Sequence, residues 1–212
     1  MKIKSLIFLC AIMALTLCLP AGCRERRDEM VAEKPVIYLY PERTAEVSVE
    51  LDYAGELTCT YPKYNGGWRV IAAPDGALVD INTKLEHYCL FWEGRADVDY
   101  DMSEGFVIKG GDSSEFLEDK LALLGLNPRE RNEFMIYWLP RMERNAYNLI
   151  AFQNEAYTDN AKLAVDPAPD CVIRVFMAFK PLEEPVDIAE QTLIPAQRHG
   201  FTVVEWGGAE VK

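Results

Sequence analysis

The stretch TAEVSVELDY, residues 44–53, alternates apolar and polar side chains along its length. Val47, Val49, Leu51 and Tyr53 fall on one face of an extended chain, and acidic or hydroxyl side chains fall on the other. A period of two residues is typical of a half-buried strand, because successive side chains of a strand point to opposite faces. The stretch therefore predicts an antiparallel strand with one face in a core and one face in water.

Further runs of the same kind follow on both sides of this stretch. Short runs rich in β-branched and aromatic residues occupy 57–61, 68–72, 85–93, 105–109, 135–139, 147–153, 172–180 and 201–206. Between the first two, Asn65-Gly66-Gly67 supplies the positive φ angles of a hairpin turn. This many short strands predicts a sandwich of two sheets.

One interruption has helical spacing instead. Asp112 and Glu115 match a capping box, apolar residues follow at helical intervals, and Gly125 suits the C-terminal end. Asn127, followed by a proline, opens a second short helix. We therefore expect a mainly β, α+β fold: an antiparallel β-sandwich with a short helical hairpin insertion at about 112–133.

The N-terminus has the pattern of a lipoprotein signal. Lys2 and Lys4 precede an apolar run from 6 to 19, and the small-residue sequence PAGC ends at Cys23. The run has 19 − 6 + 1 = 14 residues, which is short against the roughly 18 expected of a membrane-spanning helix. We expect lipid attachment at Cys23; an ordinary secretory signal is the alternative.

This interpretation divides the chain into three parts. Residues 1–22 form the signal peptide, 23–34 a charged tether, and 35–212 a single β-rich extracytoplasmic domain held to the cell envelope by the lipid. The net charge of the whole chain is −12. Removal of Lys2 and Lys4 leaves 22 − 2 = 20 basic against 34 acidic side chains, a net charge of −14. Such a charge repels phosphate backbones and argues against nucleic acid as a partner, which leaves the membrane and an envelope component.

Four runs resemble those of an uncharacterised family of bacterial lipoproteins. They are KPVIYLYP at 34–41, FWEG at 91–94, YWLP at 137–140 and VVEWGG at 203–208. The resemblance implies a location in the cell envelope. It implies no activity and no catalytic residue.

Two glutamates raise the question of catalysis. Glu93 and Glu205 each end an apolar row of a predicted strand, just before glycine. If the two strands were neighbours, these carboxylates would meet in a desolvated place as an acid/base pair, and glycosidases use such pairs at roughly 5 to 10 Å. The structural alternative is a carboxylate that pairs with an arginine, for which Arg69 and Arg174 are candidates.

Metal binding has one candidate run. Asp97, Asp99 and Asp101 alternate with apolar residues and offer oxygen ligands to calcium. The glycine that an EF-hand needs at its sixth position is replaced by Met102, which leaves an irregular calcium site or a solvated acidic edge. The chain has two histidines and no zinc or nucleotide-binding spacing, and so we expect no cofactor.

Aromatic and cysteine residues supply the remaining candidates. Tyr61, Tyr64 and Trp68 cluster around the predicted hairpin, where exposed rings would stack on sugars or grip a peptide; packing into the core is the alternative. Cys59 and Cys89 lie in strand-like runs and form a candidate disulfide, although reduced core cysteines fit equally.

The sequence favours a lipid-anchored module that binds a glycan, a peptide or an envelope partner without catalysis. A membrane-anchored hydrolase that uses Glu93 and Glu205 is the alternative.

Overall fold

The computed structural model describes residues 30–212. The predicted signal peptide and Cys23 lie outside the described residues. The described chain contains a larger and a smaller sheet. The larger has the strand order β12-β8-β9-β11-β13-β1-β7-β3. Its strands are β1 (Met30–Tyr40), β3 (Glu56–Tyr61), β7 (Leu90–Ala96), β8 (Glu104–Lys109), β9 (Tyr147–Gln153), β11 (Cys171–Leu182), β12 (Ala189–Glu190) and β13 (Thr202–Glu210).

The smaller sheet has the order β10-β2-β4-β5-β6. Its strands are β2 (Ala45–Tyr53), β4 (Trp68–Ala72), β5 (Leu78–Asp80), β6 (Glu86–His87) and β10 (Ala161–Asp166). The helices are η1 (Gly110–Asp112), α1 (Ser113–Leu123), α2 (Pro128–Met142) and the one-turn α3 (Glu155–Thr158), which leads from β9 in the larger sheet to β10 in the smaller one.

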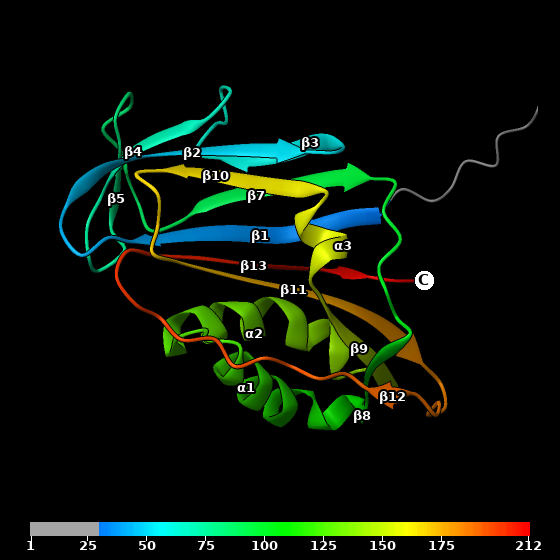
Figure 1. Ribbon diagram of the computed structural model, residues 1–212. Helices are drawn as coiled ribbons and strands as arrows, with labels where there is room; N and C mark the ends of the chain where they lie inside the picture. Colours follow the sequence, from blue (N-terminus) through cyan, green and yellow to red (C-terminus); the bar gives the residue numbers. More distant parts are fainter. Residues whose placement is uncertain (1–29) are drawn as a thin grey trace, which may run out of the picture.

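The larger sheet is covered on both faces (Figure 1). The smaller sheet packs on one face, and α1 with α2 pack on the other. Two apolar cores result, one between the sheets and one between sheet and helices. Trp68 and Trp92 belong to the first core, whereas Trp138 and Trp206 belong to the second, and all four are buried. The mainly β, sandwich-like α+β fold is therefore confirmed.

The alternating stretch forms β2 as predicted. Val47, Val49 and Leu51 are buried, while the intervening acidic side chains are exposed. Pairing with β4 and β10 on either side is antiparallel. Not every pair in the fold is antiparallel, since β11 runs parallel to β13 and β12 runs parallel to β8.

The predicted hairpin between 57–61 and 68–72 is wrong. Both strands form and Gly66 and Gly67 have positive φ, but β3 pairs with β7 in the larger sheet and β4 pairs with β2 in the smaller one. The glycines therefore serve a connection that carries the chain from one sheet to the other. Turn chemistry alone does not say which strand each neighbour joins.

The helical hairpin is confirmed and is longer than predicted. Asn127 and Glu130 form the reciprocal capping box of α2, and Gly125 has a φ of +88° just after α1. The Asp112 side chain makes no capping bond to α1. The strand predicted at 135–139 is wrong, because α2 continues to Met142 and buries Phe134, Trp138 and Met142 at intervals of four residues.

The boundary of the predicted tether is also corrected. Residues 30–34 belong to β1, which pairs with β7 from Met30 onward. A bulge interrupts the pairing between Ala32 and Val36, and Lys34 there has a φ of 61°. In the described part of the chain, no helix has the length and apolar character needed to cross a membrane.

Candidate functional site

Glu205 lies fully buried between the two sheets, where it is neutralised by an arginine. Its side chain points to the same face of β13 as Val203, into the core between the sheets. The Arg174 Nε donates to Glu205 Oε2 at 2.7 Å, and the Trp92 indole donates to Oε1 at 3.0 Å. The parallel register of β11 and β13 places Arg174 directly beside Glu205. The sequence-based alternative of a carboxylate that pairs with Arg174 is thus confirmed.

Tyr157 completes this buried cluster. Its ring stacks on Phe176, with ring centroids 4.2 Å apart, and the Arg174 guanidinium carbon lies 4.7 Å from the Tyr157 centroid. Burial, together with the Glu205 carboxylate, raises the pKa of Tyr157 well above its ordinary value. The phenol therefore stays protonated beside the ion pair.

Glu93 lies on the other face of the larger sheet. Trp92 reaches Glu205, so the next side chain on β7 points away from the core between the sheets. Glu93 Oε1 accepts a 3.4 Å hydrogen bond from the backbone N–H of Lys34, at the bulge of β1. The Lys34 ammonium lies 5.3 Å from the Phe91 ring centroid and 5.7 Å from that of Tyr137. Glu93 is thus part of a contact that ties β1, β7 and α2 together.

The predicted pair of catalytic carboxylates does not form. β1 lies between β7 and β13, which separates the backbones of Glu93 and Glu205 by two strand spacings, roughly 10 Å. Their side chains also point to opposite faces of the sheet. Each glutamate ends an apolar row as predicted, but the rows belong to different cores.

The three aromatic residues do not form an exposed platform. Trp68 is buried and its indole donates to Pro62 O, and the Tyr64 hydroxyl bonds to the backbone of Leu51 at the end of the β2–β4 pairing. Tyr61 is 60% exposed and makes an edge contact with His87. Two of the three rings therefore stabilise the core, which was the alternative for this cluster.

The predicted disulfide is absent, since Cys59, Cys89 and Cys171 are all free thiols. Cys59 pairs with Glu93 across β3 and β7, which places Cys89 four residues, roughly 13 Å, farther along the sheet. Cα atoms more than about 7 Å apart cannot be bridged without movement of the backbone. Burial raises the pKa of the Cys89 thiol to about 12, which makes it unreactive at neutral pH.

The acidic run at 97–101 does not assemble a metal site. Within residues 30–212, no group of three or more His, Cys, Asp or Glu side chains is arranged to hold a metal ion. Asp101 nevertheless lies in a pocket of about 430 Å³ at the end of β9. Hydrogen bonds from Ser103 lower the pKa of Asp101, which keeps this carboxylate ionised. The lining residues are Asp101, Glu104, Phe152, Gln153, Asn154, Glu155, Ala156 and Gln191.

Two glutamines fix the walls of this pocket. Gln153 donates to Asp101 O at 2.8 Å and accepts from Asp101 N at 2.9 Å, so it holds the 97–103 loop in place. Gln191 donates to Phe152 O at 2.7 Å and accepts from Phe152 N at 2.9 Å, so it holds the segment after β12 against β9. Each side-chain amide bonds both the N–H and the C=O of one backbone residue, as the backbone of a paired strand would. The pocket is therefore preformed.

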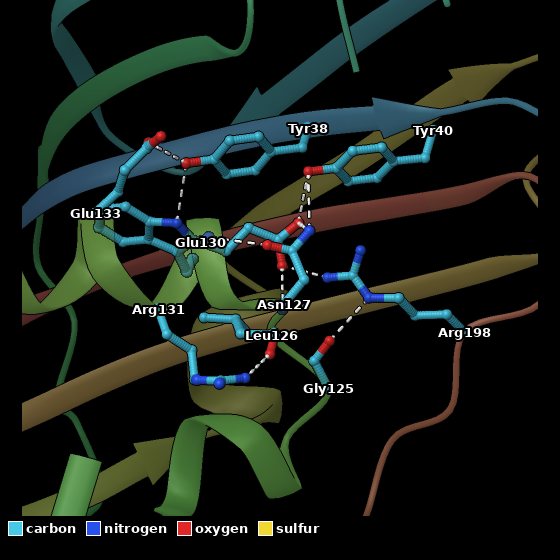
Figure 2. A network of polar contacts seen from close by, with 10 residues as sticks. Tyr38, Tyr40, Gly125, Leu126, Asn127, Glu130, Arg131, Glu133 and Arg198 are labelled. Atoms are coloured by element: carbon cyan, nitrogen blue, oxygen red, sulfur yellow. Dashed lines mark hydrogen bonds and ion pairs between the residues drawn. The ribbon is translucent and has the colours of Figure 1, made fainter. Parts of the chain in front are cut away.

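A second polar network fixes α2 on the sheet (Figure 2). The fully buried Glu130 accepts from the Tyr40 hydroxyl at 2.7 Å and from Asn127 N at 2.8 Å, and it pairs with Arg198. Tyr38 donates to Glu133 at 2.6 Å. Burial raises the pKa of both tyrosines, so their hydroxyls remain donors. Because both Glu130 oxygens accept from structural donors, this network supports the fold and leaves the pocket as the candidate site.

Of the lining residues, sequence reasoning singled out Asp101 alone, and only as a calcium ligand; it predicted no pocket at this place. Glu104, Gln153, Glu155 and Gln191 carry no motif, and only the fold brings them to Asp101. A local signal exists for Gln153 alone, which is a polar residue buried at the end of an apolar strand.

Comparison with known proteins gives one relative without a described activity. The chain is 41% identical over 78 residues to the "Uncharacterized protein in bglA 3'region" of Butyrivibrio fibrisolvens. The match covers 34% of this chain and 79% of that protein. No protein-family model and no solved structure matches the chain.

Proposed function

The chain belongs to the same family as the Butyrivibrio fibrisolvens protein, and since the name of that protein states no activity, we propose from the structure that this one is an envelope binding module. Its ligand would be a glycan or peptide that carries an ammonium group. The pocket at the end of β9 is the observation that supports this proposal. Its volume of about 430 Å³ lies in the range of roughly 300–1,000 Å³ common to small-molecule sites.

The charge of the pocket defines the chemistry of the ligand. Asp101, Glu104 and Glu155 contribute three carboxylates, and no lysine or arginine lines the pocket. A cationic group would relieve the repulsion among these carboxylates and form charge-assisted hydrogen bonds. Asn154 adds an amide that can bind hydroxyl or peptide groups. An amino sugar or a free peptide amine has both features.

The positions of the two strand-end glutamates favour binding over hydrolysis. Glu205 is held in a buried ion pair, and Glu93 accepts from the backbone on the opposite face of the sheet. Neither carboxylate lines the pocket. A mechanism that needs both at one bond is incompatible with this arrangement.

Lipid attachment at Cys23 remains part of the proposal. It rests on the apolar run and the PAGC sequence, which lie outside the described residues. We expect radiolabelled palmitate to join the full chain in growing bacteria, and Cys23→Ser to abolish the label and release the protein from the membrane fraction. Retention of the label in that variant would contradict attachment at Cys23.

Binding of an amine is expected to depend on the pocket carboxylates. The probes are a glucosamine hexamer and a Lys-Ala-Ala tripeptide, each with its N-acetylated form, titrated by isothermal calorimetry into the chain that begins at residue 24. We expect a free-amine form to bind, and Glu155→Gln with Asp101→Asn to weaken this binding at least about tenfold, because each loses a charged hydrogen bond worth about 1.5–3 kcal/mol.

The control variant is Glu118→Gln, which removes a carboxylate of α1 outside the pocket. It should leave the affinity unchanged. Equal binding of the acetylated probes, or no binding of either amine, would contradict the proposed ligand class.

A further inference from the structure

The outer face of α2 carries an apolar surface that the fold leaves uncovered. Phe134, Trp138 and Met142 bury the inner face of this helix against the sheet. On the outside, a hollow of about 520 Å³ lies between α1 and α2. Ile136 is 76% exposed beside it. The hollow is lined by Glu118, Asn132, Met135, Ile136, Leu139 and Pro140.

Helical spacing places Ile136 on a stripe along the outer face of α2. Arg129, Asn132, Ile136, Leu139 and Glu143 follow at intervals of three, four, three and four residues, so they face the same direction. Single exposed apolar side chains need no explanation. Here, however, an exposed isoleucine lies next to an apolar hollow. The isoleucine of one molecule can fill the hollow of another, so the surface is complementary to itself.

The two ends of the stripe carry opposite charges at equal distances from Ile136, which makes the stripe complementary to a second, antiparallel copy of itself. Arg129 precedes Ile136 by 136 − 129 = 7 residues, and Glu143 follows it by 143 − 136 = 7 residues. Both side chains are exposed. Seven residues correspond to about 10.5 Å along a helix. A two-fold axis through Ile136 would therefore place each Arg129 opposite Glu143 of a second copy.

We propose that a second copy of this chain covers the surface, with the two α2 helices packed antiparallel about a two-fold axis at Ile136. Each Ile136 enters the hollow of the other copy, and the Arg129–Glu143 contact forms twice. Glu143 is the C-cap of α2, where the helix dipole disfavours a negative charge. An arginine from the second copy compensates this charge. Anionic lipid would instead be repelled by Glu118 and Glu143.

Arg129 keeps donors for this contact. Its Nε bonds to Glu133 at 3.3 Å and its guanidinium lies 4.6 Å from the Tyr88 ring centroid. A guanidinium has five N–H donors in all. The surface on α2 is separate from the pocket at Asp101, so the dimer does not depend on the proposed ligand.

Cross-linking of the full chain in bacterial membranes tests the axis directly. Helices in contact lie about 8–10 Å apart, so cysteines on the axis come within disulfide reach. We expect Ile136→Cys, in a Cys59→Ser background, to give a dimer on a non-reducing gel after mild oxidation. Leu123→Cys is the matched control, because Leu123 is an exposed apolar residue of α1 outside this stripe. No more dimer from Ile136→Cys than from the control would overturn the proposal.

A charge exchange tests the partner contact. In the Ile136→Cys chain, Arg129→Glu or Glu143→Arg alone should reduce the dimer yield about tenfold, since each reversal creates two like-charge contacts. Both reversals together should restore it. Failure of the double reversal to restore the dimer, with the fold confirmed by circular dichroism, would likewise overturn the two-fold arrangement.

Discussion

Replacement of Glu205 by glutamine is expected to reduce the free energy of unfolding by about 3–5 kcal/mol, because it leaves the Arg174 guanidinium charged and buried without a counter-ion. Glu205 is fully buried, and the Arg174 side chain is only 12% exposed. Glutamine keeps the size of the side chain and an oxygen that can accept from Trp92. The loss therefore reports the ion pair, and urea unfolding monitored by tryptophan fluorescence measures it.

Two companion variants separate the buried charge from other effects. Arg174→Met together with Glu205→Gln removes both charges and should recover at least half of the loss, since a buried ion pair contributes little beyond the cost of desolvating it. Glu46→Gln breaks the ion pair between Glu46 and Arg69. The Arg69 side chain is 62% exposed and that of Glu46 is 52% exposed, so this change should lower the free energy of unfolding by less than about 1 kcal/mol. A Glu205→Gln loss as small as that of Glu46→Gln would contradict the account of the site.

Local patterns predicted the strands well where one face is buried and the other is not. The 44–53 stretch succeeded because its period of two reports this asymmetry directly. The same reasoning failed at 135–139, where aromatic and β-branched residues suggested a strand. The decisive signal there is the interval of four between Phe134, Trp138 and Met142, which extends beyond that window.

Local sequence patterns could not predict which strands pair or which core each strand faces. The pairing of β3 with β7 and of β4 with β2 follows from burial of the two cores and not from the Asn65-Gly66-Gly67 turn. The distance between Glu93 and Glu205 likewise depends on strand pairing, because β1 lies between β7 and β13. Arg174 was a correct candidate partner for Glu205 because a buried carboxylate needs a counter-charge. The selection of Arg174 over Arg69 required the parallel register of β11 and β13.

The pocket could not be predicted either, because residues distant in the sequence form it. Asp101 was identified as part of an acidic run, but its neighbours in space come from residues 104, 153–156 and 191. Nothing local in the sequence links Gln191 to the end of β9. The two glutamine contacts with backbone groups arise only once the strands are in place.

Gly208→Ala is expected to destabilise the fold by about 3 kcal/mol, because the layer between β13 and α2 has no space for a methyl group. A Cβ atom at Gly208 would lie 2.6 Å from the Met177 carbonyl oxygen and 2.6 Å from Trp138 Cζ2. Met177 is paired with Gly208 in the sheet, and Trp138 is fully buried against Phe179. Neither atom belongs to a flexible side-chain end that can move away.

Gly111→Ala is the matched control, since a Cβ atom there meets nothing within 4 Å, and it should change the free energy of unfolding by no more than about 0.5 kcal/mol. Trp138→Phe removes the ring atom that the new methyl group would meet but leaves the Met177 carbonyl. Combined with Gly208→Ala it should therefore cost less than the sum of the two single losses. Strict additivity in urea unfolding would show that Trp138 does not restrict position 208. Coupling would instead explain why Gly208 follows Trp206 on the same face of β13: Trp138 of α2 approaches the strand at a position where this face has no side chain.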